Sequence, residues 1–314
     1  KDIKGTSIEV VSSDPSNPLL GQIWYNTTSQ TLKGLEFGAA AWSTGGNMGT
    51  GRSNLGGTGT QTAAVVFGGI APGSPGNNVT NLTEEYNGSS WTNGGNMGTA
   101  RRAMASAGTQ TAALGSGGYI TPGTTTNVTE EYNGSSWTNG GNLGTARYDL
   151  AGCGTQTAGL AFGGGQPTKT ATEEYNGTSW TAGGNLTFAR AQLAGTGIQT
   201  AGLAMGGTSN PAEEYNGTAW TNGGAMSTQR AGLAAAGIQT AAVAFGGNPA
   251  PLNVSTELYD GSSWTNTTSL SIGRYLVAGA GTQTAALAAG GDGTITATEE
   301  FTGAGPATVT LSGS

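Results

Sequence analysis

The chain has 314 residues, of which 59 are glycine, and it carries a formal net charge of −7 although only 9% of its residues are charged. It contains no histidine, one cysteine and only 11 lysines and arginines, which excludes histidine-dependent triads, Cys/His zinc sites, disulfide frameworks and basic nucleic-acid-binding surfaces. The lone Cys153 is expected to be a small buried residue, and no apolar stretch approaches the roughly 20 residues of a membrane-spanning helix.

The N-terminal segment is expected to contain short strands. Strands are predicted over residues 8–11 and 22–25, and the second should pair with residues 31–33 in a hairpin around Asn-Thr-Thr-Ser. Residues 12–34, with the sequence SSDPSNPLLGQIWYNTTSQTLKG, resemble a phrase found in tail-fibre and other virion proteins of bacteriophages, particularly those of marine cyanobacteria. This resemblance implies a phage structural protein.

An internal repeat occupies the rest of the chain. The phrase Gly-Thr-Gln-Thr-Ala and its variants recur six times, with the glutamine at Gln61, Gln110, Gln156, Gln199, Gln239 and Gln283. A glycine pair follows each copy, and then a Glu-x-Tyr motif follows in five copies and Glu-x-Phe in the sixth; in those five a tryptophan stands five residues after the tyrosine. A period of roughly 40 to 50 residues with one glycine pair and one tryptophan predicts the blades of a β-propeller.

Local chemistry predicts four strands, a to d, in each repeat. Strand a runs from an arginine toward Thr-Gln-Thr, strand b ends at the glycine pair, strand c carries Glu-x-Tyr and strand d carries the tryptophan. An Asn-Gly pair between strands c and d is a strong signal for a tight hairpin. Strands a and b are rich in alanine and glycine, which suits the crowded centre of a ring.

The repeat resembles the kelch repeat over about 270 residues. The resemblance rests on the order of glycine pair, Glu-x-Tyr and tryptophan, followed by a Met or Leu and an Arg, as in Met97 with Arg101 and Leu143 with Arg147. The spacing from Tyr to Trp is shorter than in kelch repeats, and the sixth copy has Phe301 for the tyrosine and Pro306 where the tryptophan would fall. The resemblance implies an all-β propeller of four-stranded antiparallel blades.

We expect seven blades, because Phe37 and Trp42 have the same five-residue spacing as the Tyr and Trp of the repeats. Residues 1–44 would then form a divergent first blade, residues 45–314 the six kelch-like repeats of the same propeller, and residues 309–311 the outer strand of the last blade. The alternative is a six-bladed ring in which residues 1 to about 36 form a separate attachment segment.

The length variation of the repeat lies in one loop. Each of the five repeat tyrosines is followed 24 residues later by the next glutamine, whereas the second glycine of the pair precedes the aromatic residue of strand c by 17, 14, 11, 8, 12 and 10 residues. Variable b–c loops on one face of a repeat protein usually mark its binding surface. The alternative is that these loops have drifted in length because nothing constrains them. The candidate ligand-binding residues in these loops are Ile70, Asn77, Tyr119, Thr124, Gln166, Lys169, Asn210, Asn248 and Asp292.

Strictly recurring residues are expected to be structural. An arginine at the start of strand a and the first glutamate of strand c should form a repeated ion pair; the alternative is an arginine ring that holds an anionic ligand. The structural set comprises Arg52, Arg101, Arg147, Arg190, Arg230 and Arg274, then Glu84, Glu130, Glu173, Glu213, Glu257 and Glu299, and finally Trp42, Trp91, Trp137, Trp180, Trp220 and Trp264.

The sequence gives little support for catalysis. Kelch-type copper oxidases need histidine ligands, the Asp-box of sialidase propellers is missing, and Glu84 and Glu85 should point to opposite faces of a strand. We therefore expect no enzyme activity, no cofactor and no metal site.

The expected function is that of a virion protein, a tail or head fibre component that displays its b–c loops to a host-surface glycan or protein. Its partners would be other virion proteins and the host surface, in several copies per particle, without nucleic-acid binding or membrane insertion. The alternatives are a purely structural decoration protein and a secreted bacterial lectin or adhesin. The chain starts at Lys1 rather than Met, so its N-terminus gives no indication of localisation.

Overall fold

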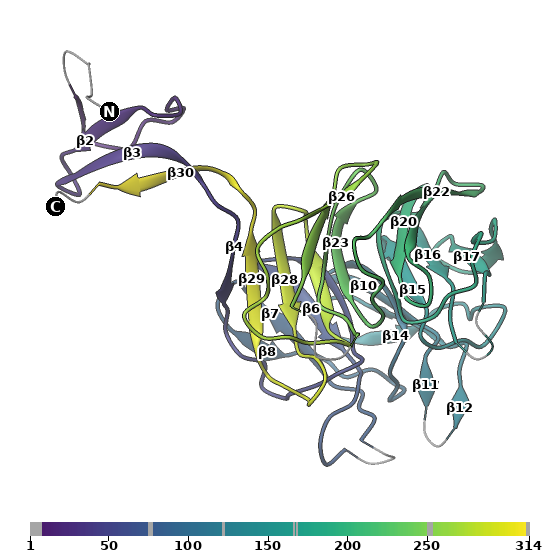
Figure 1. The fold of residues 1–314 in the computed structure, drawn as a ribbon. Helices are drawn as coiled ribbons and strands as arrows, with labels where there is room; N and C mark the ends of the chain where they lie inside the picture. Colours follow the sequence, from purple (N-terminus) through teal and green to yellow (C-terminus); the bar gives the residue numbers. More distant parts are fainter. Residues whose placement is uncertain are drawn as a thin grey trace. The chain divides into compact units, whose positions relative to one another are not determined.

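The structure, a computed structural model, describes residues 8–74, 78–120, 123–165, 167, 169–249 and 254–311. These residues form strands, turns and loops, and they contain no helix; accordingly, no helix in the described part of the chain is long and apolar enough to cross a membrane. The chain divides into two compact units, Lys1–Ala41 with Gly303–Ser314 and Trp42–Thr302 (Figure 1). The all-β prediction is confirmed.

The larger unit contains six four-stranded antiparallel sheets, numbered here in chain order. Sheet 1 comprises β5 (Gly56–Thr60), β6 (Ala63–Phe67), β7 (Thr83–Tyr86) and β8 (Trp91–Asn93). Sheet 2 comprises β9 (Ala105–Thr109), β10 (Ala112–Ser116), β13 (Thr129–Tyr132) and β14 (Trp137–Asn139). Sheet 3 comprises β15 (Ala151–Gly154), β16 (Gly159–Phe162), β17 (Thr172–Tyr175) and β18 (Trp180–Ala182). Sheet 4 comprises β19 (Leu193–Ile198), β20 (Ala201–Gly206), β21 (Pro211–Tyr215) and β22 (Trp220–Ala225). Sheet 5 comprises β23 (Ala234–Ile238), β24 (Ala241–Phe245), β25 (Thr256–Tyr259) and β26 (Trp264–Asn266). Sheet 6 comprises β27 (Ala278–Gly281), β28 (Ala285–Ala289), β29 (Thr298–Thr302) and β4 (Ala41–Thr44).

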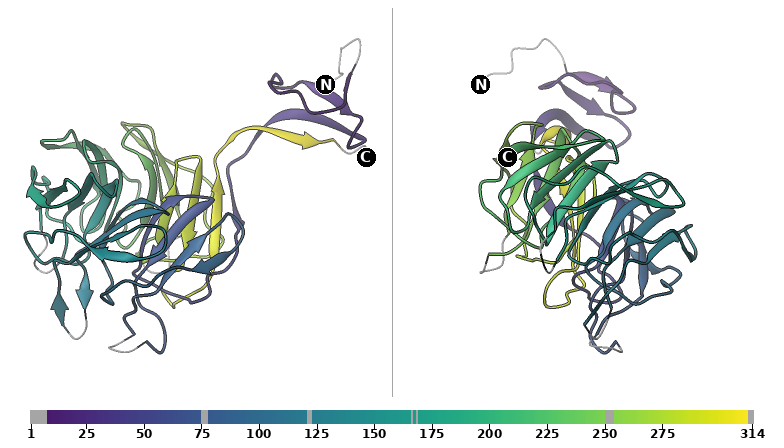
Figure 2. Two further views of the ribbon diagram at one scale, coloured as in Figure 1. Left: turned by 180° about the vertical axis from the view of Figure 1, so that it is seen from behind. Right: turned by 90° about the vertical axis from the view of Figure 1, so that its right-hand side faces the viewer.

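The first strands of these sheets are neighbours around a cycle. β5 contacts β9, β9 contacts β15, and the contacts continue through β19, β23 and β27 back to β5. Figure 2 shows the sheets of this unit from two further sides. This arrangement is compatible with a β-propeller, in which the strand nearest the axis is the first of each blade.

Glycine and alanine dominate the first strands because neighbouring sheets pack directly against them. A Cβ atom on Gly57 of β5 would lie 2.8 Å from the Cβ atom of Ala278 in β27, and one on Gly195 of β19 would lie 2.5 Å from the ring of Phe162. Non-bonded carbon atoms do not approach this closely without a shift of the packing. The expectation of a crowded centre is confirmed.

A glutamine in the turn between the first and second strands ties each sheet to the preceding one. Gln110 Nε2 donates to the carbonyl oxygens of Ala64 (3.0 Å) and Tyr86 (2.7 Å), which lie in β6 and β7. All six glutamines make this pair of bonds, and Gln61 completes the cycle by bonding to the carbonyls of Ala286 and Phe301. The constant spacing of 24 residues is therefore the distance along the chain from the acceptor tyrosine to its glutamine.

Tyrosine hydroxyls form a second tie between sheets. Tyr175 Oη donates to Glu131 Oε1 of the preceding sheet at 2.5 Å, and four other seams contain the same bond, made by Tyr86, Tyr132, Tyr215 and Tyr259. In the remaining seam both partners are replaced, since Leu258 stands for the glutamate and Phe301 for the tyrosine. Donor and acceptor are thus lost together, as expected for groups that act as a unit.

The repeat tryptophans lie in the fourth strands, as predicted. Trp137 Nε1 donates to Thr83 Oγ1 of the preceding sheet at 2.9 Å, and its ring packs on Tyr132 with centroids 5.0 Å apart. Trp42 in β4 makes the equivalent bond to Thr256 Oγ1 at 3.0 Å. The Asn-Gly hairpins between the third and fourth strands are also present, with Asn87 Oδ1 accepting bonds from the backbone N–H groups of Ser89 and Ser90 in the turn.

The smaller unit is a single sheet in the order β1 (Glu9–Val11), β2 (Ile23–Asn26), β3 (Thr31–Gly38) and β30 (Gly305–Thr310). The predicted hairpin is formed by β2 and β3, and β1 pairs with β2 in parallel. Asp14 fixes the intervening loop by accepting bonds from Trp24, Asn26 and Lys33, which lower its pKa to about 2.

Two predictions about the chain ends are wrong. Phe37 and Trp42 do not form the aromatic pair of a seventh blade, because Phe37 lies in β3 and Trp42 in β4 of sheet 6. The outer strand of sheet 6 is β4 and not residues 309–311, since β30 pairs with β3. The predicted boundary at residue 44 accordingly falls at the end of β4, and the C-terminal residues assigned to the repeats belong to the smaller unit.

At the seam between sheets 5 and 6 the glutamate and the tyrosine are replaced together, by Leu258 and Phe301. This paired replacement predicts strong coupling between the tyrosine and the glutamate at the other seams. Glu131→Leu should destabilise the protein by about 1–3 kcal/mol, because it leaves the Tyr175 hydroxyl buried without its acceptor. Adding Tyr175→Phe should recover about 1–2 kcal/mol of this loss. Urea unfolding of the wild type, both single variants and the double variant measures the coupling, and additive losses would contradict it.

The same tyrosines predict a loss of stability at alkaline pH. Burial, followed by the bond to a carboxylate, raises the pKa of Tyr86, Tyr175, Tyr215 and Tyr259 to about 12. An unfolded tyrosine titrates near pH 10, so the folded state retains these protons to higher pH. The contribution of these tyrosines to stability should therefore be constant below about pH 10 and fall between about pH 10 and about pH 12. Urea midpoints measured across this range should show a smaller fall for Tyr175→Phe, and midpoints that stay constant would refute the linkage.

Candidate binding face

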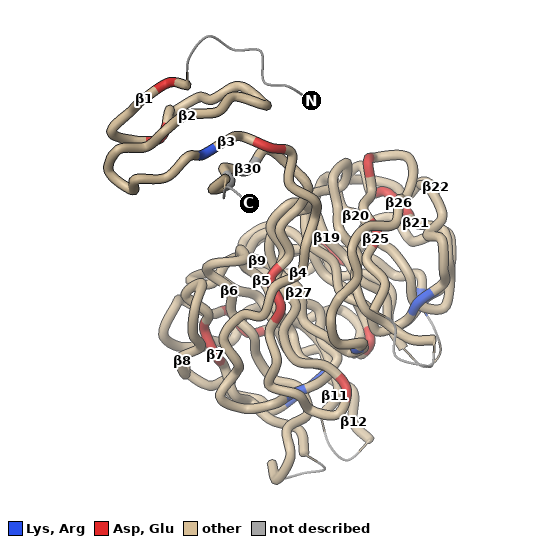
Figure 3. The backbone as a smooth tube through the Cα atoms, turned by 60° about the vertical axis from the view of Figure 1, so that its left-hand side comes forward, with Lys and Arg blue, Asp and Glu red and all other residues tan. Residues whose placement is uncertain are grey.

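Charged residues are sparse along the chain (Figure 3), and most of the arginines are buried in the repeated ion pairs. The distances from arginine Nη2 to the glutamate are 2.9, 3.3, 2.9, 2.6, 2.8 and 2.5 Å in sheets 1 to 6. Burial lowers the pKa of all six guanidinium groups, that of Arg101 to about 10, while the facing glutamates oppose the shift. The structure thus places the predicted structural residues in contact.

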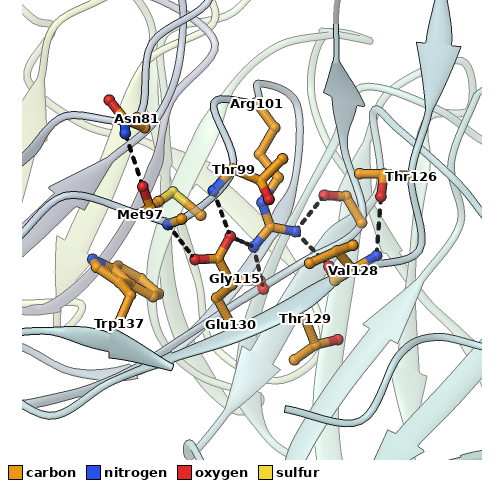
Figure 4. A network of polar contacts seen from close by, with 12 residues as sticks. Asn81, Met97, Thr99, Arg101, Gly115, Thr126, Val128, Thr129, Glu130 and Trp137 are labelled. Carbon is orange, nitrogen blue, oxygen red and sulfur yellow. Dashed lines mark hydrogen bonds and ion pairs between the residues drawn. The ribbon is translucent and has the colours of Figure 1, made fainter. Parts of the chain in front are cut away.

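Each arginine also joins the two ends of a b–c loop. Arg101 Nη1 donates to the carbonyl oxygens of Gly117, at 2.9 Å, and Val128, which begin and end the loop of sheet 2 (Figure 4). Equivalent bonds span the longest loop, from Gly68 to Leu82, and the shortest, from Gly206 to Pro211. The ends of every loop are therefore held by the same contact whatever its length.

The glutamates hold the neighbouring connection between strand d and the next strand a. Glu130 Oε2 accepts a bond from Gly98 N at 2.6 Å, and Oε1 accepts one from Thr99 N at 3.2 Å. The carboxylate and guanidinium are thus occupied by the scaffold, and the buried guanidinium groups do not offer the accessible ring of donors that the anion-binding alternative requires. Glu85 points away from Glu84 and accepts the bond from Tyr132, which confirms that the paired carboxylates do not share a face.

The predicted loop residues lie in different surroundings. Tyr119 lies in β11 (Tyr119–Ile120) and Thr124 in β12 (Thr124–Thr125), the two strands of a hairpin that projects from the larger unit (Figure 1). Ile70, Lys169 and Asn248 form isolated backbone bridges with Ser53, Arg190 and Ala231. The Asp292 side chain bonds with Tyr275. Asn77 and Gln166 fall outside the described residues.

Asn210, predicted as a ligand-binding residue because it lies in a variable loop, makes a structural bond that recurs in other repeats. Its Nδ2 donates to the Met226 carbonyl at 3.0 Å, as Asn81 does to Met97 and Asn127 to Leu143. Its side-chain carbonyl is buried and has no hydrogen-bond partner.

Six residues, each two positions after a repeat arginine, form a closed ring of backbone hydrogen bonds. The N–H of each residue donates to the carbonyl of its counterpart in the preceding sheet at 2.6 to 3.0 Å, in the order Asn54, Ala103, Asp149, Gln192, Gly232 and Leu276 and back to Asn54. All six have φ between 54° and 65°. This left-handed conformation costs a residue other than glycine roughly 1–2 kcal/mol, yet only Gly232 is a glycine.

The ring residues line a cavity of about 120 Å³ to which all six sheets contribute. A second cavity of about 150 Å³ is lined by the distal parts of the first strands, largely glycine and alanine. Only the first cavity is bordered by side chains that carry amide, carboxylate or large apolar groups.

A cluster of polar and aromatic side chains lies beside the ring. The Arg102 guanidinium carbon lies 4.8 Å from the centre of the Tyr119 ring, and the Tyr119 and Tyr148 rings are 5.4 Å apart. Burial raises the pKa of Asp149, while the charge of Arg102 and a bond to Gln192 lower it. The residues predicted from the b–c loops include Tyr119 but not Arg102, Tyr148, Asp149 or Gln192. The sequence nevertheless distinguishes these positions. Each repeat arginine is followed three residues later by Leu, Met or Val, whereas the pair of residues between them differs from copy to copy.

Among the described residues, no group of three or more Cys, Asp or Glu side chains could hold a metal ion. Cys153 is free and buried, as predicted, and burial raises its pKa to about 12. No protein-family model and no curated protein sequence matches the chain.

The buried ion pairs predict a sharp contrast between two adjacent arginines. Arg101→Met should destabilise the protein by about 3–5 kcal/mol, because it leaves the Glu130 carboxylate buried without its partner. Arg102→Met should change stability by less than about 1 kcal/mol, since Arg102 is half-exposed and outside the repeated pairs. Urea unfolding of the two variants makes the comparison, and equal losses would contradict the assignment.

Proposed function

We propose that the chain is a non-enzymatic virion protein of a bacteriophage, built on a six-bladed kelch-like β-propeller, that attaches to a host-surface glycan through its b–c loops. The observation that carries the binding role is the arginine bond to both ends of every loop. Because the same donor fixes a loop that runs from Gly68 to Leu82 and one from Gly206 to Pro211, the loops can change without altering the scaffold. Such a division between constant framework and variable loops is typical of binding proteins.

The virion assignment rests on the resemblance of residues 12–34 to phage structural proteins. These residues belong to the smaller unit, whereas all the variable loops belong to the larger one. We infer that the smaller unit attaches to other virion proteins, which leaves the loops for the host. Several copies on one particle would convert weak binding to a glycan into strong attachment.

The test is a loop graft that preserves the scaffold contacts. Residues 69–81 and 118–127 are each replaced by Gly-Thr-Ser-Asn, the sequence of residues 207–210. The replacement keeps the two carbonyls that accept bonds from the arginine, and it keeps the asparagine at the end of the loop. The wild type should bind glycans on an array and whole host cells, and the graft should bind at least about tenfold more weakly with an unchanged melting temperature.

The control variant is Asn87→Asp, in the hairpin at the opposite end of sheet 1, where sheet 5 carries Asp260 in the same turn. It should bind as the wild type does. A folded wild-type protein that binds no glycan and no cell would refute the attachment role and favour a structural decoration protein. A graft that binds like the wild type would refute the role of these two loops.

A further inference from the structure

The six residues of the backbone ring share one conformation but not one type of side chain. Asn54, Asp149 and Gln192 carry amide or carboxylate groups, whereas Ala103, Gly232 and Leu276 do not. Glycine would adopt the left-handed conformation without strain, and the chain has 59 glycines in all, many of them at positions of positive φ. The polar side chains at three of these strained positions border one cavity, where they are placed to serve a role other than folding.

The polar members lie beside three further side chains able to contact a ligand. The backbone N–H of Gln192 donates to the Asp149 carbonyl at 2.9 Å, and the side chains of Gln192 and Arg102 lie near enough to Asp149 to oppose the rise in its pKa that burial causes. Arg102 stacks on Tyr119, whose ring meets that of Tyr148. Gln192 is exposed, and the other four are half-exposed. These five residues, which we term the axial cluster, come from the connections preceding β9, β15 and β19 and from β11, next to the cavity of about 120 Å³.

The chemistry of the axial cluster suits a sugar ring. Guanidinium, carboxylate and carboxamide groups are planar and bond well to adjacent hydroxyls, and tyrosine rings offer flat surfaces to the C–H face of a pyranose. The Asp149 carboxylate lies near enough to Arg102 to offset its charge, so the cluster offers no net positive charge to an anionic ligand, and a single carboxylate is too few for a cation. The exposed large apolar side chains of the described residues do not belong to the cluster, so an apolar peptide anchor is disfavoured.

We propose that the axial cluster binds one neutral pyranose ring, the terminal residue of the recognised glycan. The proposal rests on the glycan-binding function above and adds a site at the axis, where Asp149 and Gln192 bond to adjacent hydroxyls and Arg102 donates to a third oxygen. The b–c loops would then contact the following sugars of the glycan.

The experiment uses the full chain and three substitutions at ring positions. Asp149→Asn removes the charge and keeps a residue that tolerates the left-handed conformation, and Gln192→Gly removes a polar side chain at a position glycine adopts freely. Leu276→Gly is the matched control, because it makes the same backbone change at an apolar member of the ring. The probes are methyl glycosides of glucose, galactose, mannose and N-acetylglucosamine, studied by saturation-transfer NMR and calorimetry, together with an array of neutral and anionic glycans.

The wild type and Leu276→Gly should bind the same neutral sugar with equal affinity. Asp149→Asn and Gln192→Gly should each bind it at least about tenfold more weakly, with melting temperatures no lower than that of the wild type. A merely structural role would lower stability and leave the affinity of the folded protein unchanged.

Retention of glycan binding by both Asp149→Asn and Gln192→Gly would overturn the axial site and leave attachment by the loops intact. Binding restricted to anionic glycans would overturn the assignment of a neutral sugar. A folded wild-type protein that binds no glycan would overturn the proposed function and the axial site together.

Discussion

The architecture depends on one amide group repeated around the larger unit. In each repeat a glutamine Nε2 bonds to two carbonyls on adjacent strands of the preceding sheet, so a single side chain sets both the distance and the register between sheets. Large apolar side chains cannot do this at a centre made of glycine and alanine, where even one Cβ would collide. Directional hydrogen bonds therefore take over a task that side-chain packing performs in most cores.

The contacts at the six seams are organised in layers from the axis outward. The backbone ring and the first strands lie at the centre, the glutamine reaches the second and third strands, and the tyrosine and tryptophan act farther out. Where the tyrosine bond is missing, between sheets 5 and 6, Trp42 packs on Phe245 and Phe301 with centroids 5.1 Å from each. At this seam, where the N-terminal strand β4 completes a sheet, Trp42 keeps the bond to Thr256 and the contact with a phenylalanine of the preceding sheet that Trp137 and Trp220 also make.

The sequence predicted the parts of the fold that repetition encodes. The constant spacing from tyrosine to glutamine, the Asn-Gly turns and the arginine and glutamate positions each correspond to a contact that recurs in the structure. It could not assign the partners of β4 and β30, because Ala41–Thr44 and Gly305–Thr310 are both short segments that can extend a sheet edge, and pairing is decided by the chain's path. Four of the five residues of the axial cluster were missed because they follow a recurring arginine, and only a comparison of the six copies separates what varies from what is maintained.

The buried ion pair explains how so uniform a sequence can carry a specific surface. A buried Arg–Glu pair is weak evidence for stability, since hydrophobic residues of similar size often stabilise as well. Here the pair matters for geometry. The arginine Nη1 bonds to both ends of a b–c loop, and Nη2 contacts the glutamate, which accepts bonds from the connection between strand d and the next strand a. Loop length and the side chains beside the axis can therefore change while these contacts stay the same, and that freedom is what the proposed recognition surface requires.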